Sequence, residues 1–319
     1  MRFSRYLRKC RQRLGLTQEA LVTELYLFDD ARFEGITPTT VSRWERDVTV
    51  PPTGRMADIL AYFQSRLDRP LPCVDARDAE AIEALMCEEP IGALFRPKKM
   101  VAALSLEHGA EESFELVTLR HHPRAEELLE LNAMLHRGVN TPFTRVDTRQ
   151  FKEWIDHPGN LFAAVTYRTG FLGLLFALRL KPESFDALLR FERKKSDLAP
   201  EDFAAPNEEG SVYMLSFFAI SQEVATMLFR RFYAHLIANQ ERTKEAGFIS
   251  SFEEAQALAR RLNLGNAGRK NHEGTEILAF RSDLFALMTS SMALKALFPK
   301  PGCPSDTPSP ASPPPRRGV

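Results

Sequence analysis

Two short segments near the N-terminus carry side chains suited to binding phosphates and base edges. The first sixteen residues contain six basic side chains and no acidic one. Such a run neutralises phosphates in some proteins and is merely the solvated face of a helix in others. The second segment, residues 37–43, combines small hydroxyl side chains with an arginine. The candidates for nucleic-acid contact are Arg8 and Lys9 in the first segment, and Thr37, Thr39, Thr40, Ser42 and Arg43 in the second.

Helices are needed to position these side chains, and the sequence contains the signals that begin them. Thr17 is a helix N-cap candidate because an acceptor oxygen is wanted there and Gln18 and Glu19 open a helical pattern. Thr37 is a second N-cap candidate, followed by Pro38 at the first helical position, where the missing N–H costs nothing. The second of these helices therefore presents its polar N-terminal end to the outside.

The motifs Gly-Leu-Thr-Gln-Glu at 15–19 and Ser-Arg-Trp-Glu at 42–45, behind a basic first helix, resemble the XRE (lambda repressor/Cro-like) family. The resemblance implies an all-α helix-turn-helix domain over residues 1–68 that binds double-stranded DNA. It also implies a homodimer, because family members generally bind two half-sites one helical turn apart. We therefore expect a sequence-specific transcription regulator.

The same resemblance assigns roles to single residues. It implies phosphate contact and support of the recognition helix for Gln18, base or phosphate contact for Thr39, Ser42 and Arg43, and inward packing for Val41 and Trp44. Arg43 is suited to the bidentate contact with guanine. The chain departs from the family at residues 26–36, where the link between the two helices is about nine or ten residues longer than usual. We expect Phe28 and Phe33 to pack this insertion back onto the domain.

The C-terminal part alternates between strand-like and helix-like segments. Apolar alternation predicts strands at 114–120, 160–168, 171–180, 211–220, 247–250 and 276–281. Helical periodicity predicts helices at 124–137, 148–156, 225–242 and 252–263. The Thr169-Gly170 pair between two apolar strands predicts a hairpin turn. This order resembles the GNAT acetyltransferase fold, an α/β (α+β) domain whose mixed central sheet splays open to admit acetyl-CoA.

The chain lacks the catalytic motifs that this second resemblance would imply. Residues 221–227 stand where a glycine-rich loop normally holds the CoA pyrophosphate, but they contain no glycine and include Glu223. On the last helix, Phe252 and Ala259 take the positions of the family's asparagine and tyrosine. Without the tyrosine the obvious general acid is missing, so we assign no catalytic residue. Ser221, Gln222 and Tyr213 remain as candidate contacts for CoA or another ligand.

Other polar residues of this domain have simpler explanations. We expect Tyr213 and Tyr233 to be half-buried with a wet hydroxyl, and His235 to lie on a helix face. The basic run 193–195 lies in an insertion at 183–210. It is suited to contact with DNA or a CoA phosphate, but a solvated charge run is the more common structure for such a sequence.

Bulk properties set the remaining expectations. The 319 residues carry 42 basic and 42 acidic side chains, and their length favours more than one domain. We expect a connector with short helices at 69–112, the GNAT-like domain at 113–298 and a disordered Pro/Ser-rich tail at 299–319. The four scattered cysteines predict free thiols in a reducing compartment. With no signal peptide or membrane span, the sequence predicts a cytoplasmic protein with no metal site and no cofactor.

Two hypotheses of function follow. The first is a DNA-binding regulator whose GNAT-like domain has lost acetyl transfer and serves dimerisation, sensing of a small molecule, or docking of another protein. The alternative is an active N-acetyltransferase that uses acetyl-CoA and is tethered to DNA by its N-terminal domain.

Overall fold

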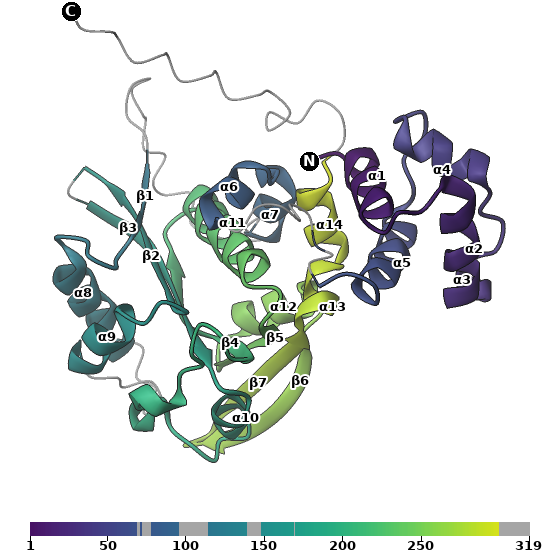
Figure 1. The fold of residues 1–319 in the computed structure, drawn as a ribbon. Helices are drawn as coiled ribbons and strands as arrows, with labels where there is room; N and C mark the ends of the chain where they lie inside the picture. The colour runs from purple at the N-terminus through teal and green to yellow at the C-terminus, as the bar shows by residue number, and fades with distance from the viewer. Residues whose placement is uncertain (69–70, 72–77, 96–113, 139–147, 169, 300–319) are drawn as a thin grey trace, which may run out of the picture.

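The structure is a computed structural model that describes residues 1–68, 71, 78–95, 114–138, 148–168 and 170–299. Figure 1 shows a group of N-terminal helices beside a larger domain built on one sheet. The predicted disordered tail lies, from residue 300 onward, outside the described residues. Of the described residues, none belongs to a helix long and apolar enough to cross a lipid bilayer.

The N-terminal part is all-helical, as predicted. It comprises α1 (Phe3–Arg13), α2 (Gln18–Phe28), α3 (Asp30–Phe33), α4 (Pro38–Glu45) and α5 (Thr53–Gln64). Both predicted caps are present, because the Thr17 side chain accepts the N–H of Ala20 and the Thr37 side chain accepts that of Thr40. Local hydrogen bonds of this kind satisfy backbone donors that a helix start leaves open.

The insertion between α2 and α4 is an extension of α2 followed by the short helix α3. The Asp29 side chain caps α3 by accepting the N–H of Arg32. Phe33 is buried, and the half-exposed ring of Phe28 packs against Phe33 and Tyr62. The two phenylalanines therefore hold the insertion on the helical unit, as the sequence predicted.

The larger domain contains a mixed sheet of seven strands. They are β1 (Glu115–Thr118), β2 (Leu161–Tyr167), β3 (Gly170–Leu180), β4 (Gly210–Ala219), β5 (Thr243–Ser250), β6 (Gly265–His272) and β7 (Thr275–Asp283). Their order is β1-β2-β3-β4-β5-β7-β6, and only β4 and β5 pair in parallel. Gly170 pairs with Tyr167, so β2 and β3 form the predicted hairpin, although Thr169 itself lies outside the described residues. This is the mixed sheet that the GNAT-like prediction requires.

One strand was missed by the sequence reasoning. The segment of β6 reads Gly-Asn-Ala-Gly-Arg-Lys-Asn-His, which has no apolar alternation. It forms a strand because it lies at the sheet edge and pairs with the apolar strand β7. An edge strand with one solvated side can be polar, so periodicity alone does not reveal it.

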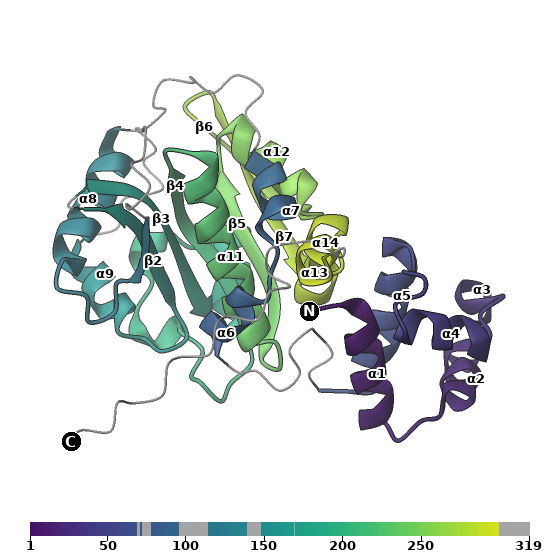
Figure 2. The same cartoon turned by 90° about the horizontal axis from the view of Figure 1, so that it is seen from above.

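Helices cover both faces of the sheet (Figure 2). On one face lie α8 (Ala125–Gly138), α9 (Thr148–Ile155) and α10 (Pro182–Leu189), whose apolar residues share a core with Phe162 and Phe176. On the other face lie α11 (Gln222–Ala238) and α12 (Glu253–Arg261), followed near the C-terminal end of the domain by α13 (Leu284–Met288) and α14 (Ser291–Leu297). Helix α11 begins at Gln222, three residues before the predicted start, and the Ser221 side chain caps it.

The segment between the two parts contains α6 (Ala79–Ala84), α7 (Glu88–Gly92) and the 3₁₀ helix η1 (Ala93–Phe95), which lie along α11. Glu83 forms ion pairs with Arg230 and Arg231 of α11. The N-terminal helices meet the sheet domain at α14, where the Phe298 ring lies 5.2 Å from Phe3 and 5.1 Å from Tyr6. One hydrophobic cluster therefore runs from the N-terminal helices into the sheet domain.

Three expectations about single residues are wrong. Cys87 is disulfide-bonded, whereas free thiols were predicted. Cys10, by contrast, is a buried thiol that forms no disulfide, as predicted. Tyr213 and Tyr233 were predicted to be half-buried with hydroxyls in contact with water. Both are fully buried instead, with 0% and 1% of their surface exposed. Burial raises the pKa of both phenols.

Candidate functional site

The sheet opens between its two parallel strands. β4 and β5 pair from Gly210 and Thr243 only as far as Tyr213 and Gly247, although within the described strands β4 continues to Ala219 and β5 to Ser250. Beyond this point β4 stays paired with β3, and β5 stays paired with β7. The two halves of the sheet therefore separate.

A bulge in β4 explains where the separation begins. Phe176 and Ala177 are consecutive in β3, but they pair with Ser216 and Met214, so Leu215 is an extra residue in β4. An extra residue bends its strand and increases the local twist. Because the bulge comes directly after the last pair with β5, it turns the rest of β4 away from its parallel neighbour.

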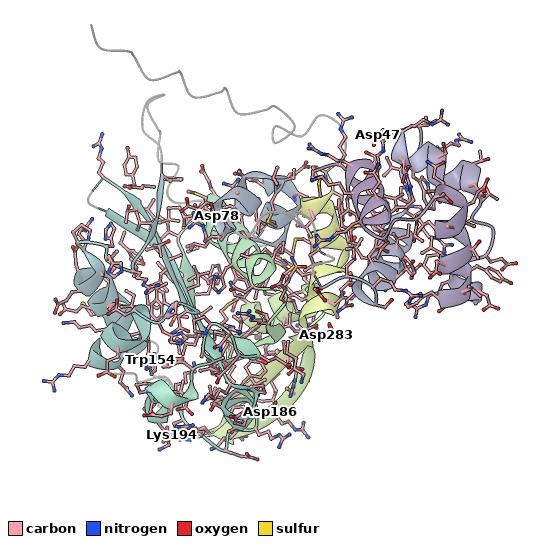
Figure 3. All side chains as sticks on the ribbon, in the orientation of Figure 1. Asp47, Asp78, Trp154, Asp186, Lys194 and Asp283 are labelled. Atoms are coloured by element: carbon pink, nitrogen blue, oxygen red, sulfur yellow. The ribbon has the colours of Figure 1, made fainter. Side chains whose placement is uncertain are left out.

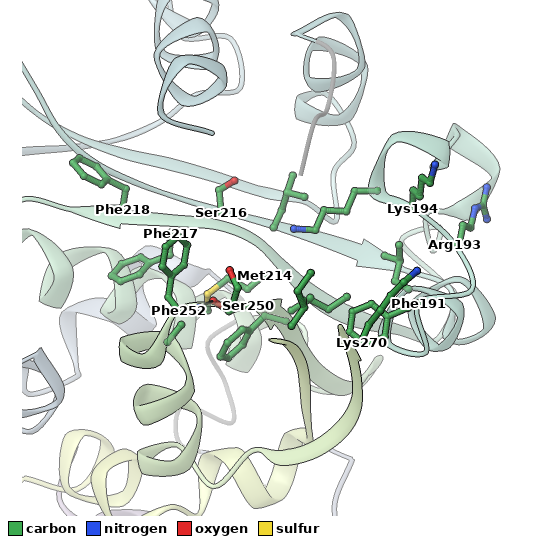
Figure 4. A pocket seen from close by; sticks show the side chains of 18 of the residues that line it. Phe191, Arg193, Lys194, Met214, Ser216, Phe217, Phe218, Ser250, Phe252 and Lys270 are labelled. Carbon is green, nitrogen blue, oxygen red and sulfur yellow. Dashed lines mark hydrogen bonds between the residues drawn. The ribbon is translucent and has the colours of Figure 1, made fainter. Parts of the chain in front are cut away.

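A cavity of about 490 Å³ fills the opening. Its walls come from Met214–Phe218 of β4, Phe248–Phe252 at the end of β5, Ala255 and Leu258 of α12, and 191–195 after α10. Figure 4 shows aromatic side chains, Phe217, Phe218 and Phe252, toward one end, and Arg193, Lys194 and Lys270 around Phe191 toward the other. The cavity thus has an apolar end and a basic end.

Three buried polar side chains line this cavity, Ser216, Lys195 and Asn132, and the sequence reasoning missed all of them. Lys195 is only 6% exposed, and its Nζ lies 5.5 Å from the centre of the Tyr213 ring. Burial lowers the pKa of Lys195 to about 8. Asn132 of α8 is 1% exposed, and its Nδ2 has no hydrogen-bond partner in the described part of the chain. The basic run 193–195 is therefore not simply solvated, because its last member points inward.

Arg193 explains how this loop holds a lysine inside. Its guanidinium forms an ion pair with Asp202 and donates to the backbone oxygen of Asp197 at 2.7 Å. Asp202 also accepts from Ser184 at 2.7 Å and from the N–H of Ala199 at 2.7 Å. Burial opposes ionisation of Asp202, but these hydrogen bonds and the charge of Arg193 outweigh it and lower its pKa. These hydrogen bonds and the ion pair fix the loop without using the Lys195 side chain.

The predicted ligand contacts Ser221, Gln222 and Tyr213 lie near the cavity but do not line it. Ser221 Oγ accepts the N–H of Val224 at 3.2 Å, so it is used as the cap of α11. Gln222 is exposed on the first turn of α11. Tyr213 lies beneath Lys195. The predicted replacements on α12 are also placed: Phe252 lines the cavity, and Ala259 is buried in the core.

The connector packs against the start of α11. A Cβ at Gly92 of α7 would lie 3.1 Å from Thr226 Oγ1 and 3.2 Å from Gln222 Nε2. The Phe95 ring lies 4.8 Å from Phe229 and 5.7 Å from Phe217, and Arg261 of α12 donates to the Leu94 oxygen at 2.5 Å. The connector therefore bridges α11 and α12 beside the aromatic end of the cavity.

The residues predicted to contact DNA fall into two groups. Arg8, which is exposed, and Gln18, which is half-buried, both bind Glu45. Arg8 Nη2 donates to its backbone oxygen at 2.6 Å, and Gln18 Nε2 donates to its carboxylate at 2.8 Å. Arg11 completes this cluster with two hydrogen bonds of 2.7 and 3.0 Å to the same carboxylate. Burial acts to raise the pKa of Glu45, but the bonds from Arg11 and Gln18 and the charges of Arg11 and Arg8 lower it overall.

The second group lies on the outer face of α4. Thr37, Thr39 and Arg43 are exposed, Thr40 and Ser42 are half-buried, and Lys9 is exposed on α1. Thr37 is also the cap of α4. Val41 and Trp44 pack inward, as predicted. The Glu45 cluster ties the end of α4 to α1 and α2.

Comparison with known proteins gives no family assignment. No protein-family model and no curated protein matches the chain. Solved structures with some similarity include NAA60 of Arabidopsis thaliana in complex with acetyl-CoA, at 13% identity over 54% of this chain and 98% of that chain, with a TM-score of 0.38. FeeM, an N-acyl amino acid synthase from uncultured soil microbes, is 9% identical over 57% of this chain and 97% of that chain, with a TM-score of 0.39. An aminoglycoside N(6')acetyltransferase from Legionella pneumophila is 9% identical over 56% of this chain and 98% of that chain, with a TM-score of 0.32. Similarity at this level identifies no substrate.

Proposed function

We propose that the sheet domain binds an acyl thioester between β4 and β5 and transfers its acyl group to an amine. The observation that carries this proposal is the cavity at the point where the two parallel strands separate. The facing edges of β4 and β5 leave their pairing there, and an extended chain bearing amides can pair with such strand edges. The pantetheine arm of an acyl-CoA is a chain of this kind.

The reaction needs few groups from the protein. The amine nitrogen attacks the thioester carbonyl, a C–N bond forms, the C–S bond breaks, and the sulfur leaves with its electron pair while the amine loses a proton. Ser216 and Ser250 contribute hydroxyls to the lining. Ser250 Oγ accepts the N–H of Phe252 at 3.1 Å, so its own proton can be donated to a thioester oxygen or to the departing sulfur.

The binding site for the nucleotide part of CoA is less clearly formed than the cavity proposed for the pantetheine arm. Backbone N–H groups at a helix start attract phosphates, but α7 already lies against the first turn of α11, and Glu223 is exposed there. The donor should therefore be tested both as acetyl-CoA and as the nucleotide-free thioester S-acetylpantetheine. A donor bound through its pantetheine arm alone would bind equally well in both forms.

Titration calorimetry with these two thioesters tests the proposal. Met214→Trp fills the cavity from β4, while Met134→Trp, at an exposed position on α8, is the matched control. We expect binding to the wild-type protein and to Met134→Trp, and loss of binding in Met214→Trp. Release of free thiol in the presence of a mixture of amines then tests transfer. The proposal fails if neither thioester binds the wild-type protein, or if Met214→Trp binds as the wild type does.

A second proposal concerns the N-terminal helices, which we propose bind duplex DNA through the outer face of α4, as a homodimer. Supporting it, Thr39 and Arg43 are exposed on a helix whose N-terminus is capped and whose C-terminal end is tied to α1 and α2. Selection of binding sequences from random duplexes by the full chain tests this. Recovery of no enriched sequence would contradict it.

A further inference from the structure

The basic end of the cavity contains a buried ammonium group without a counter-ion. Across the described residues, no carboxylate forms an ion pair with Lys195, and its closest notable neighbour is the face of the Tyr213 ring. Glu192 and Asp197 also line the cavity, but both are exposed. Asp197 already accepts hydrogen bonds from the N–H of Lys194 at 3.3 Å and from Ser196 Oγ at 3.0 Å.

A second buried donor lies in the same wall. Asn132 of α8 lines the same cavity as Lys195, and its buried Nδ2 has no partner in the described residues. Buried polar groups in folded proteins are almost always hydrogen-bonded, so two unpaired donors in one cavity require an explanation. An ammonium and an amide N–H₂ can only donate, and their complement is a group that only accepts.

The surroundings restrict what that group is attached to. Apolar side chains line much of the same cavity, among them Leu174, Leu188, Leu215, Phe191 and Ile249. The lining carries the basic side chains Arg193, Lys194, Lys195 and Lys270 against the acidic Glu192 and Asp197, so basic groups are in excess there. A single negative charge on an apolar body fits this environment, whereas a highly charged phosphate ester would leave most of its oxygens against hydrocarbon.

We infer that Lys195 and Asn132 form a binding site for the carboxylate of an acyl acceptor that carries an apolar body. The inference depends on the proposed acyl transfer only in naming the ligand an acceptor, since the anion site follows from the two buried donors. The acceptor is accordingly an amine that also bears a carboxylate, such as an apolar amino acid. Its carboxylate binds at the Lys195 end, and its amine points along the cavity toward Ser250.

The burial of Lys195 supports this inference. Burial of an ammonium group destabilises the fold, and the same burial lowers the pKa of Lys195 to about 8. A bound carboxylate offsets the cost by restoring a charge-assisted hydrogen bond. Groups that are costly until a ligand arrives are typical of binding sites.

The test uses two probes that contain neither a thioester nor an amine. Phenylpropionate carries a carboxylate on an apolar body, and phenylpropionamide has the same shape without the charge. Each is titrated into the full-length protein at pH 7 by calorimetry. We expect the carboxylate to bind at least about tenfold more tightly, as a charge-assisted hydrogen bond predicts.

Matched variants locate the effect. Lys195→Met removes the buried ammonium and keeps an apolar chain of similar length, while Lys194→Met removes the same charge from the exposed neighbour. We expect Lys195→Met to lose the preference for the carboxylate and Lys194→Met to keep it. Asn132→Leu removes the second donor and should weaken carboxylate binding several-fold. If melting curves show that Lys195→Met does not fold, Asn132→Leu takes its place as the variant that tests the site.

Several results would overturn the inference. These are equal affinity for both probes, no heat from either probe at millimolar concentration, preference retained in Lys195→Met, or equal loss in Lys194→Met, which would indicate only a basic rim. Failure of acyl transfer alone leaves these results standing, because the probes involve no donor. Binding of thioesters without any carboxylate preference would conversely retain the proposed function and reject this site.

Discussion

Two polar clusters of this chain have opposite character. At the N-terminal end, the buried carboxylate of Glu45 is surrounded by Arg8, Arg11 and Gln18, all of which donate to it or to its backbone oxygen. In the sheet domain, Lys195 and Asn132 are also buried. Among the described residues Lys195 has no ion pair and its Nζ lies over the Tyr213 ring, while Asn132 Nδ2 has no hydrogen-bond partner. Figure 3 shows how far apart they are: Asp47, two residues after Glu45, and Lys194, next to Lys195, lie at opposite ends of the molecule.

The difference separates structure from binding. A buried ion pair whose hydrogen bonds are complete holds elements together, here α4 against α1 and α2, and it leaves nothing for a ligand. Buried donors without acceptors weaken the fold and are available to a ligand. The N-terminal helices therefore present their binding candidates on the outside, on α4, whereas the sheet domain presents its own inside a cavity.

Removal of the Glu45 side chain should have the largest effect. Glu45→Ala leaves Arg11, whose side chain is 13% exposed, without its counter-ion, and removing one partner of a buried pair typically costs about 3–5 kcal/mol. Urea denaturation of the full chain measures the free energy of unfolding. Glu34→Ala, at an exposed position after α3, is the control and should change it little. A loss in Glu45→Ala no larger than in the control would mean that the cluster does not hold the helices.

Removal of the Lys195 charge should act in the opposite direction. Lys195→Met should stabilise the ligand-free protein at pH 7 by about 3 kcal/mol, because the pKa falls from 10.5 to about 8 and each unit corresponds to about 1.4 kcal/mol. Between those two pH values the unfolded chain binds the proton and the folded protein does not, so the stability of the wild type rises with pH there. The advantage of the variant should therefore shrink above pH 8 and vanish above 10.5. Melting curves across this range check both statements, and a destabilised Lys195→Met would show that Lys195 is paired.

Arg43 should matter for binding and not for folding. Arg43→Ala should weaken the proposed specific DNA binding by roughly 1–3 kcal/mol at one base position, while the free energy of unfolding stays unchanged because the side chain is exposed. Affinity measurements with selected and random duplexes check this. Lys9→Ala is the contrasting variant and should weaken both duplexes alike. Equal loss on both duplexes for Arg43→Ala would contradict its role.

The smallest effect concerns the cap of α4. Thr37→Ala removes the oxygen that accepts the N–H of Thr40 at 3.2 Å and should cost about 1 kcal/mol of stability. Thr39 lies two residues later, is exposed and does not make this bond, so Thr39→Ala should cost less. Chemical denaturation of both variants compares them directly, and identical values would show that the cap does not stabilise α4.

The sequence by itself determined the local features of this protein. Helix starts at Thr17 and Thr37, the apolar strands β2, β3 and β4, and the helical N-terminal part all depend on residues within a few positions of each other, so they can be predicted from the order of side chains. The same holds for Val41 and Trp44, whose spacing along α4 directs them inward. The packing of Phe28 and Phe33 against the N-terminal helices was likewise predicted from the sequence of the insertion.

Only the tertiary structure decided the cavity and what lines it. The separation of β4 from β5 depends on the pairing of strands that are some thirty residues apart, with Leu215 bulged against β3. The burial of Lys195 depends on a loop fixed by Arg193 and Asp202, and in the sequence it is one of three consecutive basic residues. Charge and periodicity report what a residue prefers, whereas burial is imposed by the elements packed around it.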